Sequence, residues 1–269
     1  MEKKLVASDK YPHQFYYVVG NGDKTILLIH GFSEDPRIFA ELVTHFSKEY
    51  TIILPNLPGS ASTVCIADMS IESLADYCHT ILQENKCAKI VIAGHSMGGY
   101  IALAFAKKYP DNILGICNIN SNVFADSAES KGLRNRRIKI VQDGGKDAYF
   151  ANMVKSLYAE EIVNLHPEKI ENHLAQSKEL SADAVVAYHT AMRDRLDFAA
   201  WVSNCNKPFQ FIIGKNDTTL AFEKLMEQTI IPNITFIWIS KTGGHMSMVE
   251  HSKELAYHLQ FFATYCASQ

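Results

Sequence analysis

Short apolar runs of strand length alternate with segments of helical periodicity along most of this chain of 269 residues. The runs are rich in β-branched and aromatic residues, which favour strands. Strands that alternate with helices are typical of a parallel sheet covered by helices on both faces. The pattern therefore predicts an α/β fold with a mostly parallel, doubly wound sheet. Strands are expected at residues 15–19, 25–29, 51–54, 89–93, 113–119, 209–213 and 234–239.

One long segment, residues 122–200, breaks this alternation. It contains no strand-like run, and helices are expected there at 148–158, 168–180 and 182–195. A helical insertion between two sheet strands explains this pattern, and it would lie over one end of the sheet. We therefore expect a core formed by residues 1–121 and 201–269, with residues 122–200 as a helical cap.

A glycine-flanked serine lies between an expected strand and an expected helix. Gly94 and Gly98 lack a Cβ, so the strand and the helix can approach closely around Ser96. A strand, a sharp turn and a helix are the context in which G-x-S-x-G forms a nucleophile elbow. The backbone N–H of Met97 would then point from the helix N-terminus into the space that the serine hydroxyl enters. The motif predicts a nucleophile and half of an anion-stabilising site.

Three further groups directly follow expected strands and should therefore lie at the same edge of the sheet. Phe32 follows the strand at 25–29, Asp217 follows 209–213 and His245 follows 234–239. A serine needs a base to take its proton, and a carboxylate holds the base imidazole in the right tautomer. We expect Ser96, His245 and Asp217 to form a catalytic triad, and the N–H groups of Phe32 and Met97 to form an oxyanion hole.

Each of these roles has a competitor in the chain. Asp194 and Asp197 are rivals for the acid, but they precede a strand and do not follow its end. None of the histidines has the spacing of metal ligands, so no metal site is expected. The competing histidines are His251 and His258, expected on a helix surface, and His30 and His95, expected to be structural.

Composition narrows the classes of function. A formal net charge of −3 gives no electrostatic case for nucleic acid or an anionic membrane. There is no apolar leader at the N-terminus, and six scattered cysteines favour reduced thiols, so we expect a cytoplasmic protein. The basic run at 131–139 is expected to be a solvated helix face. The alternative is that Arg134, Arg136 and Arg137 engage a substrate carboxylate.

The chain resembles the α/β-hydrolase superfamily, in its cap-bearing esterase-like branch, over nearly its whole length. This resemblance implies the nucleophile–acid–histidine order seen here and a helical cap at 122–200. Asn56 stands where many members have an aspartate, in a loop that is shortened here. The segments that carry the resemblance are His30-Gly31-Phe32, Pro55-Asn56-Leu57-Pro58-Gly59-Ser60, Gly94-His95-Ser96-Met97-Gly98-Gly99, Gly214 with Asp217, Gly244-His245 and residues 191–197.

These features predict a serine hydrolase that cleaves a small carboxylic ester through an acyl-enzyme, with no metal or organic cofactor. Cap side chains would contact the substrate, and Tyr149, Met153, Tyr188 and Met192 are the candidates. The resemblance leaves alternatives open: a C–C hydrolase, a thioesterase or a lyase that uses the same triad, or a small-molecule binding protein with this fold. The sequence gives no indication of the oligomeric state.

Overall fold

The computed structural model describes residues 1–269 and contains one eight-stranded sheet in the order β1-β2-β4-β3-β5-β6-β7-β8. The five neighbouring pairs from β4 to β8 are parallel, and the two pairs that involve β2 are antiparallel. The prediction of a mostly parallel sheet is confirmed. The strands are β1 (Glu2–Leu5), β2 (Phe15–Val19), β3 (Lys24–Ile29), β4 (Tyr50–Pro55), β5 (Ile90–His95), β6 (Ile113–Ile119), β7 (Phe209–Gly214) and β8 (Thr235–Ser240).

The N-terminal edge of the sheet differs from a simple alternation. β1 was not expected from the sequence, because three of its four residues are charged and it is almost wholly exposed at the sheet edge. The turn at residues 20–23 joins β2 to β3, yet these two strands do not pair, because β4 lies between them. β3 is buried toward its end, as expected of a central strand with helices on both faces.

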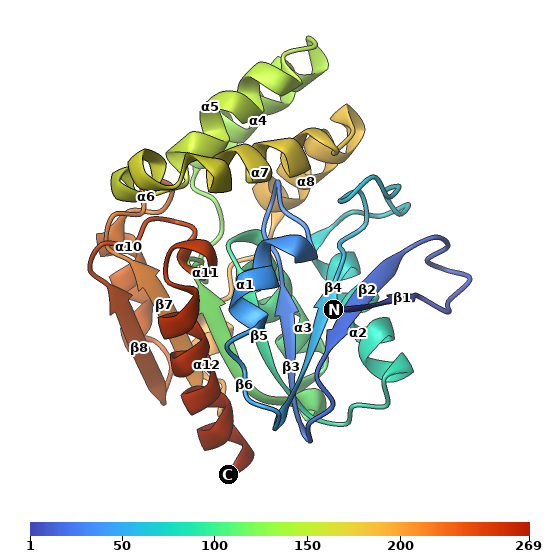
Figure 1. Ribbon diagram of the computed structural model, residues 1–269, viewed down its shortest axis with the longest axis vertical. Helices are drawn as coiled ribbons and strands as arrows, with labels where there is room; N and C mark the ends of the chain where they lie inside the picture. The colour runs from blue at the N-terminus through green and yellow to red at the C-terminus, as the bar shows by residue number, and fades with distance from the viewer.

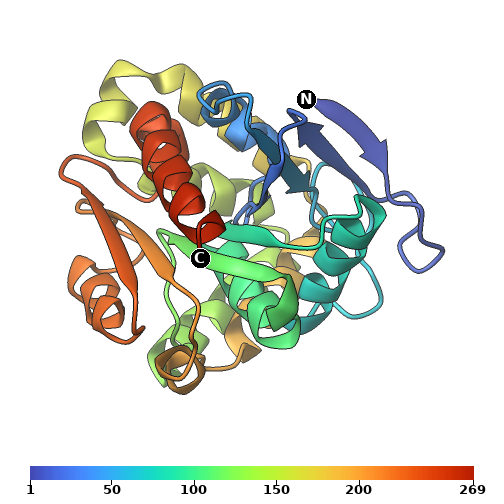
Figure 2. The same ribbon diagram turned by 90° about the horizontal axis from the view of Figure 1, so that it is seen from below.

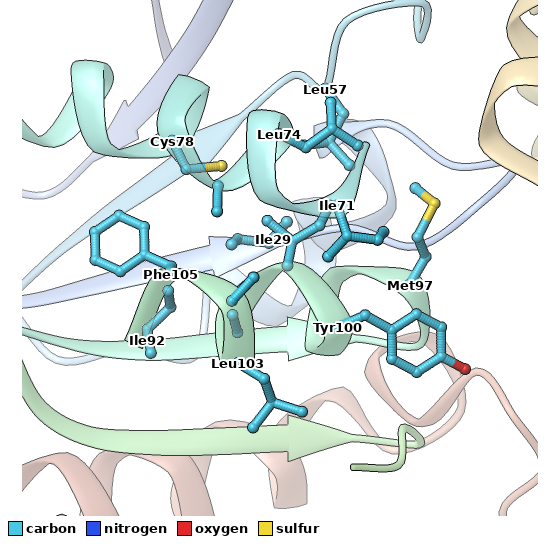
Figure 3. Packing of buried hydrophobic residues seen from close by; sticks show 14 of the residues in the cluster. Ile29, Leu57, Ile71, Leu74, Cys78, Ile92, Met97, Tyr100, Leu103 and Phe105 are labelled. Carbon is cyan, nitrogen blue, oxygen red and sulfur yellow. The ribbon is translucent and has the colours of Figure 1, made fainter. Parts of the chain in front are cut away.

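The side chains of β3 alternate between two hydrophobic clusters, one on each face of the sheet. Leu27 and Ile29 belong to the cluster that contains the buried faces of α2 (Ile71–Glu84) and α3 (Met97–Lys108), shown in Figure 3. Ile26 and Leu28 belong to the second cluster, under α1 (Ala40–Val43) and α12 (Ser252–Ala267). Figure 2 shows α12 on one side of the sheet and α2 and α3 on the other. The sheet is therefore doubly wound, with its strands held between two apolar layers.

Local signals in the sequence explain several helix ends. The hydroxyl of Ser70 accepts a hydrogen bond from Ser73 N–H at the start of α2, and α3 ends at Lys108, two residues before Pro110. None of the helices combines the length and the apolar composition that a membrane-spanning helix requires. Beyond the helices that lie wholly within residues 122–200, the remaining ones are η1 (Pro36–Phe39), α1 (Ala40–Val43), η2 (Pro110–Asn112), α9 (Ala199–Ser203), α10 (Phe222–Glu227), η3 (Gln228–Ile230), α11 (Ser247–Glu250) and α12 (Ser252–Ala267).

The chain between β6 and β7 forms helices and no strand, as the sequence pattern predicts. Figure 1 shows these helices grouped over one end of the sheet. Residues that follow β3, β5 and β7 share a cavity with residues of these helices. The helices therefore cover the end of the sheet at which these three strands terminate. The helices are α4 (Ala128–Gln142), α5 (Lys146–Ser156), α6 (Glu160–Leu165), α7 (Pro167–Lys178) and α8 (Ala182–Asp194).

Candidate active site

Ser96 occupies the sharp turn between β5 and α3. Its backbone has φ +50° and ψ −115°, a region that non-glycine residues rarely adopt and that the surrounding structure must enforce. A Cβ on Gly94 would collide with the backbone of Gly98, and one on Gly98 would collide with the Ile29 carbonyl. Only glycine at these two positions lets the strand and the helix come this close. The geometry is that of the predicted elbow.

Asp217 and His245 form a buried pair beside this turn. His245 Nδ1 lies 2.7 Å from Asp217 Oδ2, and both side chains are almost fully buried. The second oxygen, Oδ1, accepts the N–H groups of Thr219 and Leu220 at 2.8 and 3.0 Å. Because a carboxylate only accepts, Nδ1 carries the ring proton and Nε2 is left to accept one.

Charge outweighs burial in setting the pKa values of this pair. Burial alone would lower the pKa of His245, but the nearby carboxylate of Asp217 raises it above its ordinary value. Burial would likewise raise the pKa of Asp217, while the charge of His245 and its hydrogen bonds lower it. The two directions agree, so Asp217 is ionised and stabilises the imidazolium form of His245.

Asn120 holds this pair in place, and sequence reasoning missed it. Its Nδ2 donates to Asp217 Oδ2 and to the Gly244 carbonyl, both at 3.1 Å, and its Oδ1 accepts the Ser247 hydroxyl at 2.6 Å. The backbone of Asn120 has φ +44°, which asparagine tolerates better than most residues. Asn120 directly follows β6. The rule that functional residues follow the ends of parallel strands could therefore have identified it.

A second histidine–carboxylate pair lies behind the first. His95 Nε2 contacts the His245 carbonyl at 2.8 Å, and His95 Nδ1 lies 2.8 Å from Glu34 Oε1, off the line of a well-formed hydrogen bond. The other oxygen of Glu34 accepts the Gly31 N–H at 2.7 Å. Burial would raise the pKa of Glu34, but the charges of His95 and His173 lower it to about 2. Glu34 thus connects the loop after β3 to the residue before Ser96, and sequence reasoning did not identify it.

A cavity of about 350 Å³ lies between the strand ends and the helices of the 122–200 segment. Ser96, His245 and Phe32 line its sheet side. The Ser96 hydroxyl makes no hydrogen bond, and the Phe32 N–H has no acceptor in the protein. Met97 N–H belongs to the first turn of α3, where N–H groups lack a partner within the helix. The structure therefore brings four of the predicted site groups together, with Asp217 directly behind His245.

Three of the four predicted substrate-binding residues line this cavity: Tyr149, Met153 and Met192. Tyr188 does not. It is fully buried, and its hydroxyl donates to the Pro58 carbonyl at 2.6 Å and contacts Ser60 Oγ at 3.1 Å. An aromatic residue at helical spacing is as typical of the core as of a pocket, and the sequence did not separate the two. The Tyr188 hydroxyl is bound by the loop after β4, so we do not assign Tyr188 to the substrate site.

The basic run on α4 is not a uniformly solvated face. Arg134 and Arg137 are half-buried and line the cavity, whereas Arg136 between them is exposed. A helix places residues three apart on one face, which explains why these two arginines share a side that Arg136 does not.

The rival residues occupy other environments. Asp194 pairs with Arg193 at 2.7 Å on the surface, and Asp197 accepts the N–H groups of Ala125 and Ala199. No group of three or more histidine, cysteine or acidic side chains is arranged to hold a metal ion. Among the other histidines, His30 accepts the Leu57 N–H, His258 stacks on Trp238 and His251 is the N-cap residue of α12.

Comparisons with known proteins agree with this architecture. Residues 24–252 match the alpha/beta hydrolase fold family. Lipase 1 of Psychrobacter immobilis is 26% identical in an alignment that covers 98% of this chain and 84% of that protein. The thermostable monoacylglycerol lipase of Bacillus sp. (strain H-257) is 32% identical over 43% of this chain and 49% of that protein.

Solved structures superpose over nearly the whole chain. A thermophilic esterase from Thermogutta terrifontis matches with a TM-score of 0.90, 22% identity and coverage of 99% of both chains. The enol-lactonase from Burkholderia xenovorans LB400 matches with a TM-score of 0.86, 16% identity and coverage of 94% of this chain and 98% of that one. At these identities the structures establish the fold alone. Together with the family match over residues 24–252, they show that this chain belongs to the alpha/beta hydrolase fold family.

Proposed function

We propose that this protein is a serine hydrolase that cleaves a small carboxylic ester through an acyl-enzyme. The observation that carries the proposal is the buried Asp217–His245 pair beside the strained turn at Ser96, with Ser96 and His245 lining one cavity. The lipases at 26% and 32% identity support an ester as the substrate class. No cofactor is needed for this chemistry.

In the proposed reaction, Ser96 Oγ attacks the ester carbonyl carbon while His245 Nε2 takes the hydroxyl proton. The tetrahedral oxyanion is bound by the N–H groups of Phe32 and Met97, and loss of one such donor typically costs about 3 kcal/mol. His245 then returns its proton to the departing alcohol. Water attacks the acyl-enzyme by the same route in reverse, which releases the acid and restores Ser96.

We assign residues 122–200 as the cap of this site. α4, α5 and α8 each contribute side chains to the cavity wall, while the reacting groups follow the strands. The absence of a hydrogen bond from the Ser96 hydroxyl is compatible with this proposal, since catalytic hydrogen bonds often tighten only when substrate binds.

The proposal is tested with a fluorophosphonate probe and a series of p-nitrophenyl esters from acetate to long acyl chains. We expect the wild-type protein to be labelled at Ser96 and to hydrolyse the short esters. Ser96→Ala should lose labelling and lower kcat by on the order of 10⁶-fold, with its fold intact. Ser203→Ala, which changes an exposed serine of α9, is the matched control. An unlabelled wild-type protein, or an active Ser96→Ala variant, would reject the proposal.

A further inference from the structure

The cavity wall above Ser96 carries positive charge that the protein does not neutralise. Nineteen residues line the cavity and only eight of them are hydrophobic, so its wall is unlike the apolar pocket expected for a plain alkyl chain. The two cations among them, Arg134 and Arg137, come from consecutive turns of α4.

Arg134 has an acidic partner, but it shares that partner. Arg134 Nε lies 2.7 Å from Asp126 Oδ2, and Arg195 Nη1 lies 2.6 Å from Asp126 Oδ1. Burial would raise the pKa of Asp126, but the two guanidinium groups lower it, so the carboxylate is ionised. The single negative charge of Asp126 is therefore shared by the guanidinium groups of Arg134 and Arg195. It does not neutralise a third cation.

Arg137 is that third cation, and its side chain has no ion pair or hydrogen bond in the structure. Its neighbours in the cavity wall include Tyr149 and His189, whose hydroxyl and ring Nε2 contact each other at 3.0 Å. Burial lowers the pKa of His189 to about 3, with a further contribution from Arg134 and Arg137. His189 is therefore neutral, and neither neighbour supplies a negative charge to Arg137.

Glu34 is the other carboxylate of the cavity wall and Asp217 lies behind His245, and both are already engaged. Glu34 is held by His95 and the Gly31 N–H, and Asp217 by His245, Asn120 and two backbone N–H groups. A guanidinium that is half-buried without a partner binds an anion strongly, because its planar donors match carboxylate oxygens in pairs.

We infer that the substrate is an ester that also carries a free carboxylate, and that Arg137 binds this carboxylate while Ser96 attacks the ester carbonyl. The inference rests on the proposed function and narrows it to one substrate class, the half-esters of short dicarboxylic acids. Arg134 supports the site through its added positive charge. Arg137 is therefore a determinant of specificity in the cap.

The test compares monomethyl succinate, glutarate and adipate with neutral methyl esters in which an isopropyl group replaces the carboxylate. For at least one chain length, the wild-type kcat/KM for the half-ester should exceed that for its neutral counterpart by about ten- to a hundredfold. Arg137→Gln should abolish this preference, mainly by raising KM for the half-ester. Arg136→Gln removes the same charge one residue away, outside the cavity, and should leave the preference unchanged.

Binding separates this inference from the proposed function. Calorimetry with the Ser96→Ala protein measures half-ester binding without turnover, with and without Arg137→Gln. The wild-type protein could hydrolyse no ester while the Ser96→Ala protein binds the half-ester and loses this binding with Arg137→Gln. That result would support the anion site and reject the proposed esterase activity. Equal hydrolysis of charged and neutral esters at every chain length, unchanged by Arg137→Gln, would keep the esterase and overturn the anion site. An equal loss of preference in Arg136→Gln would overturn it as well.

Discussion

Two buried histidine–carboxylate pairs lie side by side at the carboxyl end of this sheet, with their imidazole rings 4.8 Å apart. In each pair a carboxylate oxygen lies within 2.8 Å of the histidine Nδ1. They differ in what the other ring nitrogen faces. His95 Nε2 is bonded to the His245 carbonyl, whereas His245 Nε2 has no protein partner and its ring lines the cavity. Of the two histidines, His245 is therefore the one that the proposed reaction uses to exchange a proton with the substrate.

Both histidines have a carboxylate partner, so the ring nitrogen without a protein partner is what distinguishes the proposed catalytic imidazole, His245, from His95. A carbonyl oxygen only accepts, so His95 must carry a proton on Nε2. A base that activates Ser96 must instead have an unprotonated Nε2. The same change of carboxylate to amide should therefore lower kcat far more in the Asp217–His245 pair than in the Glu34–His95 pair.

Asp217→Asn should produce the largest effect. The amide oxygen would stay on the Thr219 and Leu220 N–H groups, and the NH₂ group would face His245 Nδ1. Nδ1 then becomes an acceptor and the ring proton moves to Nε2, which can no longer take a proton from Ser96. We expect kcat to fall by about 10⁴-fold with little change in KM. Steady-state kinetics on a p-nitrophenyl ester measure it.

Asp194→Asn and Asp197→Asn are the controls for this substitution, since both side chains are engaged elsewhere. A larger loss of kcat in either control would show that the acid is a different residue.

Removal of the Asn120 side chain should have the next largest effect. Asn120 donates to Asp217 Oδ2 and supports the Gly244 carbonyl, so its loss leaves Asp217 freer to turn away from His245. Glycine is the substitution of choice, because the backbone φ of +44° would strain alanine. We expect Asn120→Gly to lower kcat by about ten- to a hundredfold, the usual value of a hydrogen bond to a charged group. An unchanged kcat, with native circular dichroism, would exclude a positioning role for Asn120.

The residues that sequence reasoning found and those it missed differ in a physical way. Ser96, Asp217 and His245 follow strand-like runs beside glycines, and the edge rule for parallel sheets was enough to bring them together. Glu34 lies in a loop, and its role depends on a histidine 61 positions away, a contact that no local pattern encodes. Contacts between residues so far apart in the sequence depend on the tertiary structure, and the periodicity of a single sequence does not predict them.

The basic helix α4 shows the same limit. Charged residues surround it on most sides, so it has no apolar stripe to reveal which face turns inward. The expectation of a solvated face therefore held for Arg136 and failed for Arg134 and Arg137. The sheet could also be predicted only in part. The alternation of strands and helices predicted its parallel core, but it did not predict that β4 lies between β2 and β3.

Glu34→Gln should have a much smaller effect than Asp217→Asn, although it is the same chemical change. The amide oxygen can accept the Gly31 N–H, and its NH₂ group can face an unprotonated His95 Nδ1. That leaves the ring proton on Nε2, where the His245 carbonyl requires it. We expect a loss of less than about tenfold in kcat, since the net worth of the altered hydrogen bonds is modest. A loss as large as that of Asp217→Asn would show that the two pairs act as one catalytic unit.

The pH dependence of kcat/KM for a neutral ester is the finest probe of the two pairs. Because Asp217 raises the pKa of His245, the unprotonated base should form only above the ordinary histidine range, and the acid limb should lie above pH 6.5. Glu34 also raises the pKa of His245, although less than Asp217 does. Removal of its charge in Glu34→Gln disfavours the imidazolium, so the limb should move to lower pH, by less than about one unit. A shift to higher pH would show that the charge of Glu34 does not stabilise the imidazolium form of His245.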